Sequence, residues 1–532
     1  MNSNSKFRRY EEWIRVNSSW LALGLIGLAF ALRFYQAELC YLNADEAMYF
    51  HFARPMGWAG AYEGSKLLAH PPLYFMILHG TILLGRSELA LRLPSLIAGT
   101  VALWFGFSWL RITVGELAAL AGLLVMALSP AAVAASTEVR PYGILLFFIC
   151  ISLYATERMF KDQSVSWAVM QGCFLLASMM VHYTALVAVA SICAYTLFRS
   201  YFDGVSRRIL EIILTGQVVL ASALAWQYFT IVRTRLSFGA GQAADYLQPY
   251  YYAAGLETPI GFVWRMIFET FRRVTRGHDL AIVCVLIFLM GLAAIFFGRT
   301  LSPAHFGALI VLPFVVGMIC GVLQIFPFAG SRHQAYLLPF IAAGLATSLA
   351  WVRSGMAAVL LSAIAIFAIP TWIIRGVPDN DGRTFPKRDM VAAIDYIHRA
   401  IPPGAPILVD IETRETLEYY LGKDDKHLDA SANRSAQEYL GGYRVMTPRE
   451  YVWAFRVEEL PARIAELEQE HQFQDPIRIV SVSWFQEPLS SRLPKQPGFS
   501  AKEFGRISVV ELDTRVEKPE VGNYGVAGNV GR

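Results

Sequence analysis

The feature that most constrains this chain is a series of long apolar runs. Each has about the length that crosses a bilayer as a helix, roughly 17 to 25 residues, and a basic stretch precedes the first run. We predict eleven transmembrane helices, at residues 20–35, 88–110, 115–135, 141–157, 166–181, 183–199, 209–231, 279–297, 305–326, 335–352 and 355–374. A further apolar piece, 73–85, is too short to cross and is expected at the membrane interface.

The composition agrees with a polytopic membrane protein. Hydrophobic residues make up 55% of the 532 residues and charged residues only 17%, which is unusual for a soluble chain. The net charge of +4 is spread over many loops, so nucleic acid is not an expected partner, whereas membrane lipids are. The six cysteines lack CxxC spacing, which argues against a metal site or disulfides.

The pattern changes near residue 375, so we divide the chain into a membrane module, 1–375, and a soluble domain, 376–516. The soluble domain alternates short apolar runs with charged residues and prolines, as an α/β sheet domain does. We predict helices at 387–400, 414–421 and 457–470, and strands at 406–411, 477–483 and 506–512. The Gly-rich tail, 517–532, is predicted to be disordered.

With eleven crossings, the loop after the first helix lies on the same membrane face as every second loop after it. That face collects the segments 136–142, 182–183, 232–278 and 326–334, together with the soluble domain. The basic N-terminus is expected in the cytoplasm. Lys and Arg are evenly divided between the two faces unless the arginines of the 232–278 loop are set aside. We therefore expect the C-terminal domain outside an inner (plasma) membrane.

Few ionisable residues fall near the middle of the predicted spans. This pattern argues against an ion-coupled transporter and indicates a site at the membrane surface. The carboxylate candidates are Asp45 and Glu46, directly after the first helix. Adjacent carboxylates disfavour each other's ionised form, which favours a general base. The alternative, which the spacing alone favours, is a pair of solvated acids at a helix end.

Cationic motifs on the same predicted face could hold an anion. The candidates are Lys66, His70, Arg140, Arg332 and His333. Arg140 precedes a proline at a helix start, where free backbone amides favour anions. The alternatives are a turn with incidental polar residues before Pro71, a surface pair between Glu138 and Arg140, and a snorkelling interfacial Arg332.

The 232–278 loop contains a stretch with helical periodicity. Apolar residues recur on one face, and Arg265, Arg272, Arg273 and Arg276 lie largely on the other. We interpret the stretch as an interfacial helix that could bind lipid phosphates. A helix packed on the protein with solvated arginines is an equal alternative, so these arginines stay outside the catalytic set.

The order of the motifs is more specific than any one of them. An Asp-Glu loop is followed by His-Pro-Pro-Leu-Tyr (70–74), Arg-Leu-Pro-Ser (92–95), Glu-x-Arg-Pro-Tyr (138–142) and Arg-His-Gln-Ala-Tyr-Leu-Leu-Pro (332–339). In this order the motifs resemble the family 39-like glycosyltransferases of the GT-C fold, which include protein O-mannosyltransferases and lipid A aminoarabinose transferases. The resemblance covers residues 1–375. The soluble domain departs from the β-trefoil of eukaryotic mannosyltransferases.

The resemblance implies transfer of a hexosyl or pentosyl group from a polyprenyl-phosphate donor to an acceptor hydroxyl, with inversion at the anomeric carbon. By this resemblance Asp45 is the base and Glu46 completes the pair. A glycosyl phosphate already carries a good leaving group, so the enzyme needs a carboxylate for the hydroxyl and cations for the phosphate. We assign the phosphate to Lys66, His70, Arg140, Arg332 and His333.

The remaining expectations follow from the same reaction. The acceptor is a glycan, a lipid or a protein, and the setting is a bacterial cell envelope. No cofactor is required; a divalent cation is compatible with the wider fold, although no ligand cluster stands out. A lipid or polysaccharide transporter and a non-catalytic membrane scaffold are the alternatives from other classes.

Overall fold

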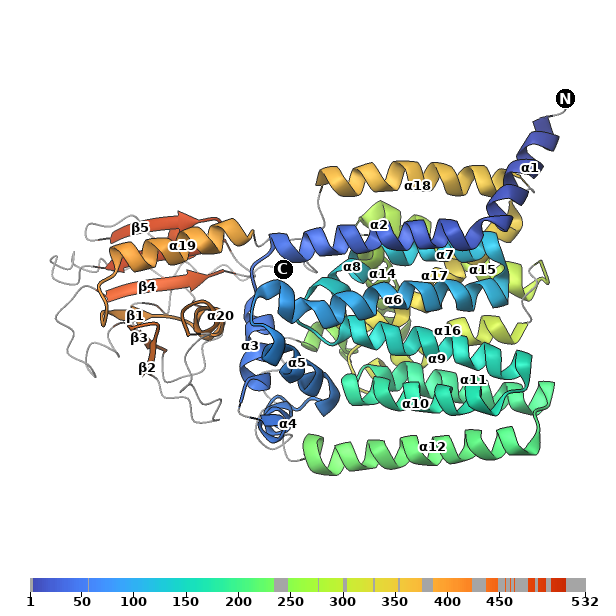
Figure 1. The fold of residues 1–532 in the computed structure, drawn as a ribbon, viewed down its shortest axis with the longest axis horizontal. Coiled ribbons are helices and arrows are strands. Elements are labelled where there is room, and N and C mark those ends of the chain that lie inside the picture. Colours follow the sequence, from blue (N-terminus) through green and yellow to red (C-terminus); the bar gives the residue numbers. More distant parts are fainter. Residues whose placement is uncertain are drawn as a thin grey trace. The chain divides into compact units, whose positions relative to one another are not determined.

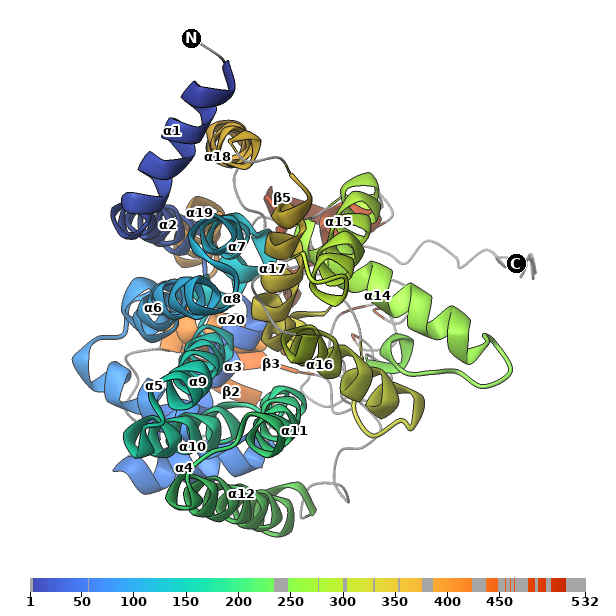
Figure 2. The same cartoon turned by 90° about the vertical axis from the view of Figure 1, so that its right-hand side faces the viewer.

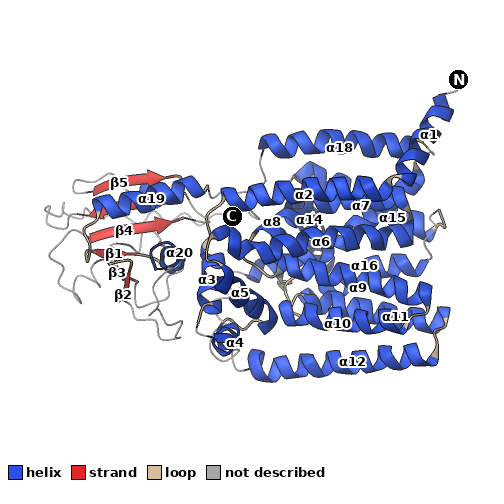
Figure 3. Cartoon of the chain, in the orientation of Figure 1, coloured by secondary structure: helices blue, strands red, loops and turns tan. Residues whose placement is uncertain are grey.

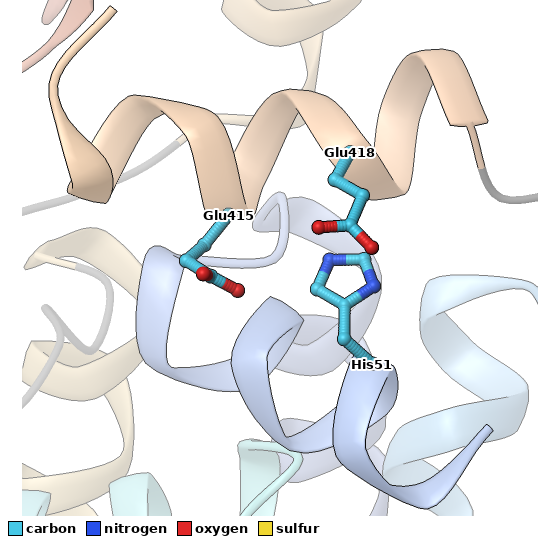
Figure 4. Close-up of side chains that lie close together, drawn as sticks. All are labelled: His51, Glu415 and Glu418. Carbon is cyan, nitrogen blue, oxygen red and sulfur yellow. The ribbon is translucent and has the colours of Figure 1, made fainter. Parts of the chain in front are cut away.

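The computed structural model describes residues 3–512, except residues 56, 234–246, 276, 300–303, 329–330, 353–354, 376–385, 423–436, 448–454, 456–459, 461–463, 465–476, 484–486 and 494–498. The chain forms two compact units. One comprises Met1–Cys40 and Tyr49–Thr384, and the other comprises Tyr41–Met48 and Phe385–Arg532. All described strands lie in the second unit (Figure 3).

Long apolar helices build the first unit, and they run side by side (Figures 1 and 2). Its elements before the 232–278 loop are α1 Ser3–Val16, α2 Ser18–Leu39, the end of α3 Ala44–Ala53, α4 Gly57–Leu67, α5 Pro72–Leu84, α6 Glu88–Val114, α7 Glu116–Leu128, α8 Pro130–Thr137, α9 Tyr142–Asp162, α10 Val165–Val181, α11 Ala185–Asp203, α12 Arg207–Gln227 and η1 Tyr228–Val232. The later elements are η2 Gln248–Tyr250, α14 Pro259–Thr275, α15 His278–Phe296, α16 Ala304–Val322, η3 Arg332–Leu337, α17 Leu338–Thr347, η4 Ser348–Trp351 and α18 Met356–Arg375.

Each of the eleven predicted spans coincides with helical structure. Among the described residues, 8 helices are long and apolar enough to cross a membrane. The pair α7 and α8, bent by 57°, makes a ninth candidate if the two helices form one span. The apolar parts of α10 and α18 are shorter than these candidate spans. The predicted fold class, a mainly α polytopic membrane protein, is confirmed. The short apolar piece forms α5, a helix of 13 residues.

The break between α7 and α8 is capped by a buried arginine of α2. Pro130 has no N–H, so it cannot serve the carbonyl group of Met126 four residues earlier. Arg33 supplies the missing donors: its guanidinium donates to Met126 O at 3.0 Å and to Ala127 O at 2.8 Å. A cation at this position also interacts favourably with the negative end of the helix dipole. The bend is therefore stabilised by a side chain from a neighbouring helix.

The second unit contains a mixed six-stranded sheet with the strand order β2-β3-β1-β4-β6-β5. Its strands are β1 Pro406–Leu408, β2 Gln437–Leu440, β3 Tyr443–Met446, β4 Ile477–Val482, β5 Phe499–Phe504 and β6 Ile507–Leu512. Strand β1 pairs in parallel with β3 and β4, and the other pairs are antiparallel. The helices are α19 Lys387–Ala400, α20 Ile411–Gly422 and α22 Leu489–Arg492.

Most predicted elements of this domain are found. The helices predicted at 387–400 and 414–421 are α19 and part of α20, and the strands predicted at 477–483 and 506–512 are β4 and β6. The strand predicted at 406–411 is the shorter β1, because α20 already begins at Ile411. Most of the helix predicted at 457–470, and the tail 517–532, lie outside the described residues. Strands β2, β3 and β5 were not predicted.

Alternate strand residues of the sheet face two separate cores. Ile407 and Val409 belong to one core, and Leu408 belongs to the other. Tyr41 is also part of the first core, although it lies far away in the sequence. The Leu42 N–H donates to the Tyr420 hydroxyl of α20 at 2.9 Å. The stretch 41–48, which carries both carboxylate candidates, is thus an integral part of the second unit.

We predict that Arg33→Met lowers the apparent melting temperature of the protein in detergent. The substitution leaves two buried carbonyl groups without their donor, and each such loss costs about 1–3 kcal/mol. Loss of the monodisperse peak on heating measures the effect. Arg207→Met is the control, because Arg207 pairs with Glu211 on the surface of α12 and exposed pairs contribute little. Equal melting temperatures for the two variants would contradict the capping role.

Candidate functional site

Three histidines and two arginines gather in the first unit. The ring centroids of His182 lie 5.6 Å from His70 and 6.1 Å from His333. Tyr142 contacts both His182, at 5.1 Å, and His333, at 6.2 Å. We call His70, Arg140, His182, Arg332 and His333 the cationic cluster.

The arginines join this cluster by different contacts. The Arg140 guanidinium lies 4.7 Å from the Tyr49 ring centroid, a cation–π contact, and the Tyr49 ring lies 5.5 Å from His70. Arg332 directly precedes His333 and is one of the groups whose charge acts on His182. The structure therefore brings together four of the five predicted phosphate ligands.

Four of the five members of the cluster precede or begin a helix, and His333 follows Arg332 in η3. His70 comes before α5, Arg140 before α9 and His182 before α11, while Arg332 starts η3. The N-terminal ends of helices carry partial positive charge and free N–H groups. Because the side chains meet, these positive ends add to the field of the arginines. The arrangement is suited to a multiply charged anion.

His182 is buried at the centre of the cluster. Its Nδ1 accepts a hydrogen bond from the Thr184 N–H at 3.2 Å and lies 2.9 Å from the Thr184 hydroxyl. The ring proton must then reside on Nε2, which is left as a donor. Burial, followed by the nearby charges of His70, His333, Arg140 and Arg332, holds the pKa of His182 well below its ordinary value. His182 is therefore a neutral donor.

Two hydrogen bonds hold the backbone of Arg140 in place. The Ser95 hydroxyl of α6 donates to Arg140 O at 2.6 Å, and the Arg140 N–H donates to Glu138 O at 2.8 Å. Arg140 and Glu138 are 4% and 8% exposed, so the alternative of a surface pair is wrong. The next residue, Pro141, leads directly into α9.

A small cavity adjoins Arg332. It is lined by polar groups that include Arg273, Arg332 and Ser331, and by apolar groups that include Val274 and Leu338. Its walls come from α8, α14, η3 and α17. Its lining of cationic, polar and apolar side chains suits a phosphate next to a short hydrocarbon segment.

The amphipathic stretch 259–275 forms α14, as predicted. Phe262, Met266 and Phe271 are buried, which supports packing on the protein. Arg265 pairs with Glu257 and Arg272 pairs with Glu269, both at 2.6 Å. Arg273, in contrast, lines the cavity. Arg276 lies outside the described residues.

The two carboxylates lie in the first turn of α3. The Glu46 N–H donates to the Asn43 side-chain oxygen at 3.0 Å, and the Asn43 N–H donates to the Glu46 carboxylate at 3.1 Å. This reciprocal pair is a capping box. Glu46 thus orients the start of the helix that carries Asp45. Asp45 and Tyr49 are four residues apart on α3, so their side chains leave the same helix face.

Lys66 has different neighbours from His70. Its ammonium pairs with the Glu63 carboxylate at 2.7 Å on α4 and lies 4.3 Å from the Tyr62 ring centroid. The hydrogen bond to Glu63 raises the pKa of Lys66 above its ordinary value. We do not count Lys66 as a member of the cationic cluster, because these contacts are with residues of α4.

Two members of the site were not among the predicted ligands. His182 was visible only as a polar turn between two apolar runs, and Arg273 as one of four arginines on an amphipathic helix. A lone histidine carries no motif, so its position on the predicted face was the only available signal.

Comparison with known proteins supports the fold. Residues 69–229 match a family model described as dolichyl-phosphate-mannose-protein mannosyltransferase. This segment contains His70, Arg92, Arg140 and His182. None of the curated proteins searched matches the chain.

Two crystal structures of ArnT from Cupriavidus metallidurans are similar to this chain. The structure bound to undecaprenyl phosphate has 16% sequence identity to this chain and a TM-score of 0.54. The match covers 94% of this chain and 100% of the ArnT chain. The apo structure has 15% sequence identity and a TM-score of 0.55, and the match covers 95% of this chain and 100% of the ArnT chain. The chain therefore has the GT-C glycosyltransferase fold of these structures.

Proposed function

We propose that this protein is an inverting membrane glycosyltransferase that moves a sugar from a polyprenyl-phosphate donor to an acceptor hydroxyl on the outer membrane face. The observation that carries the proposal is the cationic cluster at the helix N-termini, next to a cavity with both cationic and apolar walls. The similar ArnT structure holds undecaprenyl phosphate, which supports this class of donor.

The cationic cluster acts on the leaving group. As the bond between the anomeric carbon and the phosphate oxygen breaks, negative charge grows on the phosphate. Arg140, Arg332 and the His182 Nε2–H are fixed donors that stabilise this charge, and they need no rearrangement during the reaction. His70 and His333 make the remaining contacts with the phosphate. The adjoining cavity receives the first part of the lipid chain.

Asp45 acts on the acceptor. It takes the proton of the incoming hydroxyl while the hydroxyl oxygen attacks the anomeric carbon from the face opposite the phosphate. A single displacement of this kind inverts the anomeric configuration. The products are the glycosylated acceptor, the polyprenyl phosphate and protonated Asp45. Glu46 supports this step by capping α3 through Asn43.

The proposal leaves the transferred group as hexosyl or pentosyl and the acceptor as a glycan, a lipid or a protein. No metal is required, because the arginines supply positive charge and the histidines supply hydrogen-bond donors; a divalent cation is compatible with the proposal. Lys66 is proposed to contact the donor from α4, outside the cationic cluster. We place the second unit on the extracytoplasmic side of the inner membrane, the side on which the proposed reaction meets its acceptor.

We predict that Asp45→Asn abolishes transfer but still binds undecaprenyl phosphate. The amide has nearly the same shape but cannot accept the proton. Release of sugar from a panel of polyprenyl-phosphate sugars measures activity, and quenching of tryptophan fluorescence measures binding. Asp162→Asn is the control, because Asp162 pairs with Arg158 at the far end of α9. An active Asp45→Asn enzyme would remove the proposed base, and a wild type that binds lipid without transfer would favour a transporter.

We predict that Arg332→Met weakens binding of undecaprenyl phosphate by about tenfold or more. Hydrogen bonds to charged groups contribute about 1.5–3 kcal/mol, and 1.4 kcal/mol is a factor of ten in Kd. Binding should also become less dependent on salt, because one ionic contact is lost. Arg158→Met serves as the control at the opposite end of α9. Unchanged affinity and salt dependence would exclude Arg332 from the phosphate site.

We predict that the contribution of His182 to phosphate binding increases as the pH falls from 7.5 to 5.5. In the empty site the pKa of His182 lies well below its ordinary value. A bound phosphate offsets the nearby positive charges and raises this pKa, so the complex binds more protons than the empty site. The ratio of the Kd of His182→Gln to that of wild type should rise severalfold. In this ratio the titration of the lipid phosphate itself cancels, and a constant ratio would contradict the prediction.

A further inference from the structure

The Arg-Leu-Pro-Ser motif is not used in the chemistry proposed above. It lies in the first part of α6, where Arg92 and Ser95 are one turn apart on the same side of the helix. Both side chains are buried, each with 1% of its surface exposed. A buried guanidinium is costly unless hydrogen bonds satisfy it, so its contacts are informative.

Arg92 holds the end of α2. Its Nη1 donates to Ala37 O at 2.6 Å and to Cys40 O at 2.7 Å. Carbonyl groups at a helix C-terminus have no partners within the helix, and a cation there is favourable. Cys40 is the last residue of its part of the first unit, and the chain then continues into the stretch 41–48. Arg92 therefore fixes the point from which the Asp45 segment departs.

Ser95 holds the start of the Arg140 segment. Its hydroxyl donates to Arg140 O at 2.6 Å. One residue into α9, Gly143 lies so close to α6 that a Cβ there would overlap the Ser95 carbonyl oxygen. The beginning of α9 is thus pressed against α6 at the position where Ser95 reaches Arg140.

We infer that Arg92 and Ser95 are positioning residues: one turn of α6 fixes both the segment that leads to the proposed base and the segment that carries a proposed phosphate ligand. This inference rests on the proposed function for its catalytic consequence. A displacement reaction needs the acceptor and the leaving group in line, and a misplacement of about 1 Å can cost roughly a hundredfold in rate. Neither side chain takes part in the chemistry itself.

The two residues are expected to affect different kinetic constants. Arg92→Met should lower kcat about 10- to 100-fold with little change in the KM of the donor, because it releases the Asp45 segment. Ser95→Ala should weaken binding of undecaprenyl phosphate about five- to tenfold, because it releases Arg140. Arg92→Lys retains one cationic donor and should recover part of kcat. A general folding defect would not separate the constants in this way.

Matched controls exist on the same helix. Arg111 also joins α6 to α2, through the Ser19 hydroxyl at 2.8 Å, but at the opposite end of both helices. Thr100 donates its hydroxyl to Leu96 O within α6 itself. Arg111→Met and Thr100→Val therefore remove a comparable contact without releasing either segment, and both should keep wild-type kcat and lipid affinity.

Hydrogen exchange followed by mass spectrometry tests the inference independently of activity. Arg92→Met should accelerate amide exchange in peptides covering 40–48, and Ser95→Ala in peptides covering 138–143, with no such change in the controls. If the wild type transfers no sugar, the proposed function fails, and exchange still decides whether the two residues hold these segments. If the wild type is active but Arg92→Met behaves like Arg111→Met in both assays, the positioning role is wrong.

Discussion

Backbone carbonyl groups at the ends of membrane helices must find donors within the protein, because hydrocarbon offers no water. Two buried arginines meet this demand. Arg33 of α2 serves the end of α7, and Arg92 of α6 serves the end of α2. Helix α2 therefore both gives and receives such a contact. Its position, and the point at which the chain leaves it, depend on these two cations.

At the N-terminal ends of other helices, cationic or hydrogen-bond-donating side chains are added to the positive charge of the helix end. Where α9 and α11 begin, the structure adds Arg140 and His182 to the partial positive charge of the helix termini. The carbonyl groups at the ends of α2 and α7 receive buried arginines, whereas donors of the proposed site lie beside the positive ends of α9 and α11. This asymmetry gives the cationic cluster a net positive field without one long basic run in the sequence.

The sequence predicted the membrane fold well because hydropathy is a local and strong signal. The eleven apolar runs, and helix 387–400 with its exact bounds, required no knowledge of tertiary contacts. Counting crossings also placed His70, Arg140, Arg332 and His333 on one face, and the structure brings them together. The predicted proximity of these residues, which are far apart in the sequence, came from membrane topology alone.

Other features depend on tertiary contacts and could not be predicted. Strands β2 and β3 have four residues each, too few for a clear alternation. The Asn43-x-x-Glu46 spacing is that of a capping box, but the prediction for Glu46 rested on its place beside Asp45 and did not include this cap. The ion pair of Lys66 with Glu63 was likewise not predicted. Nothing local identifies Tyr41 as a core residue of a domain that begins more than three hundred residues later.

That last contact has a consequence for how the protein can be divided. A cut near residue 384 would appear to separate a membrane enzyme from an appended soluble domain. It would in fact remove most of a hydrophobic core and leave Tyr41 behind, without the Tyr420 hydroxyl that holds the next amide. A chimera that exchanges the C-terminal domain must therefore exchange residues 41–48 as well. Such an exchange transfers the proposed base, Asp45, together with the C-terminal domain.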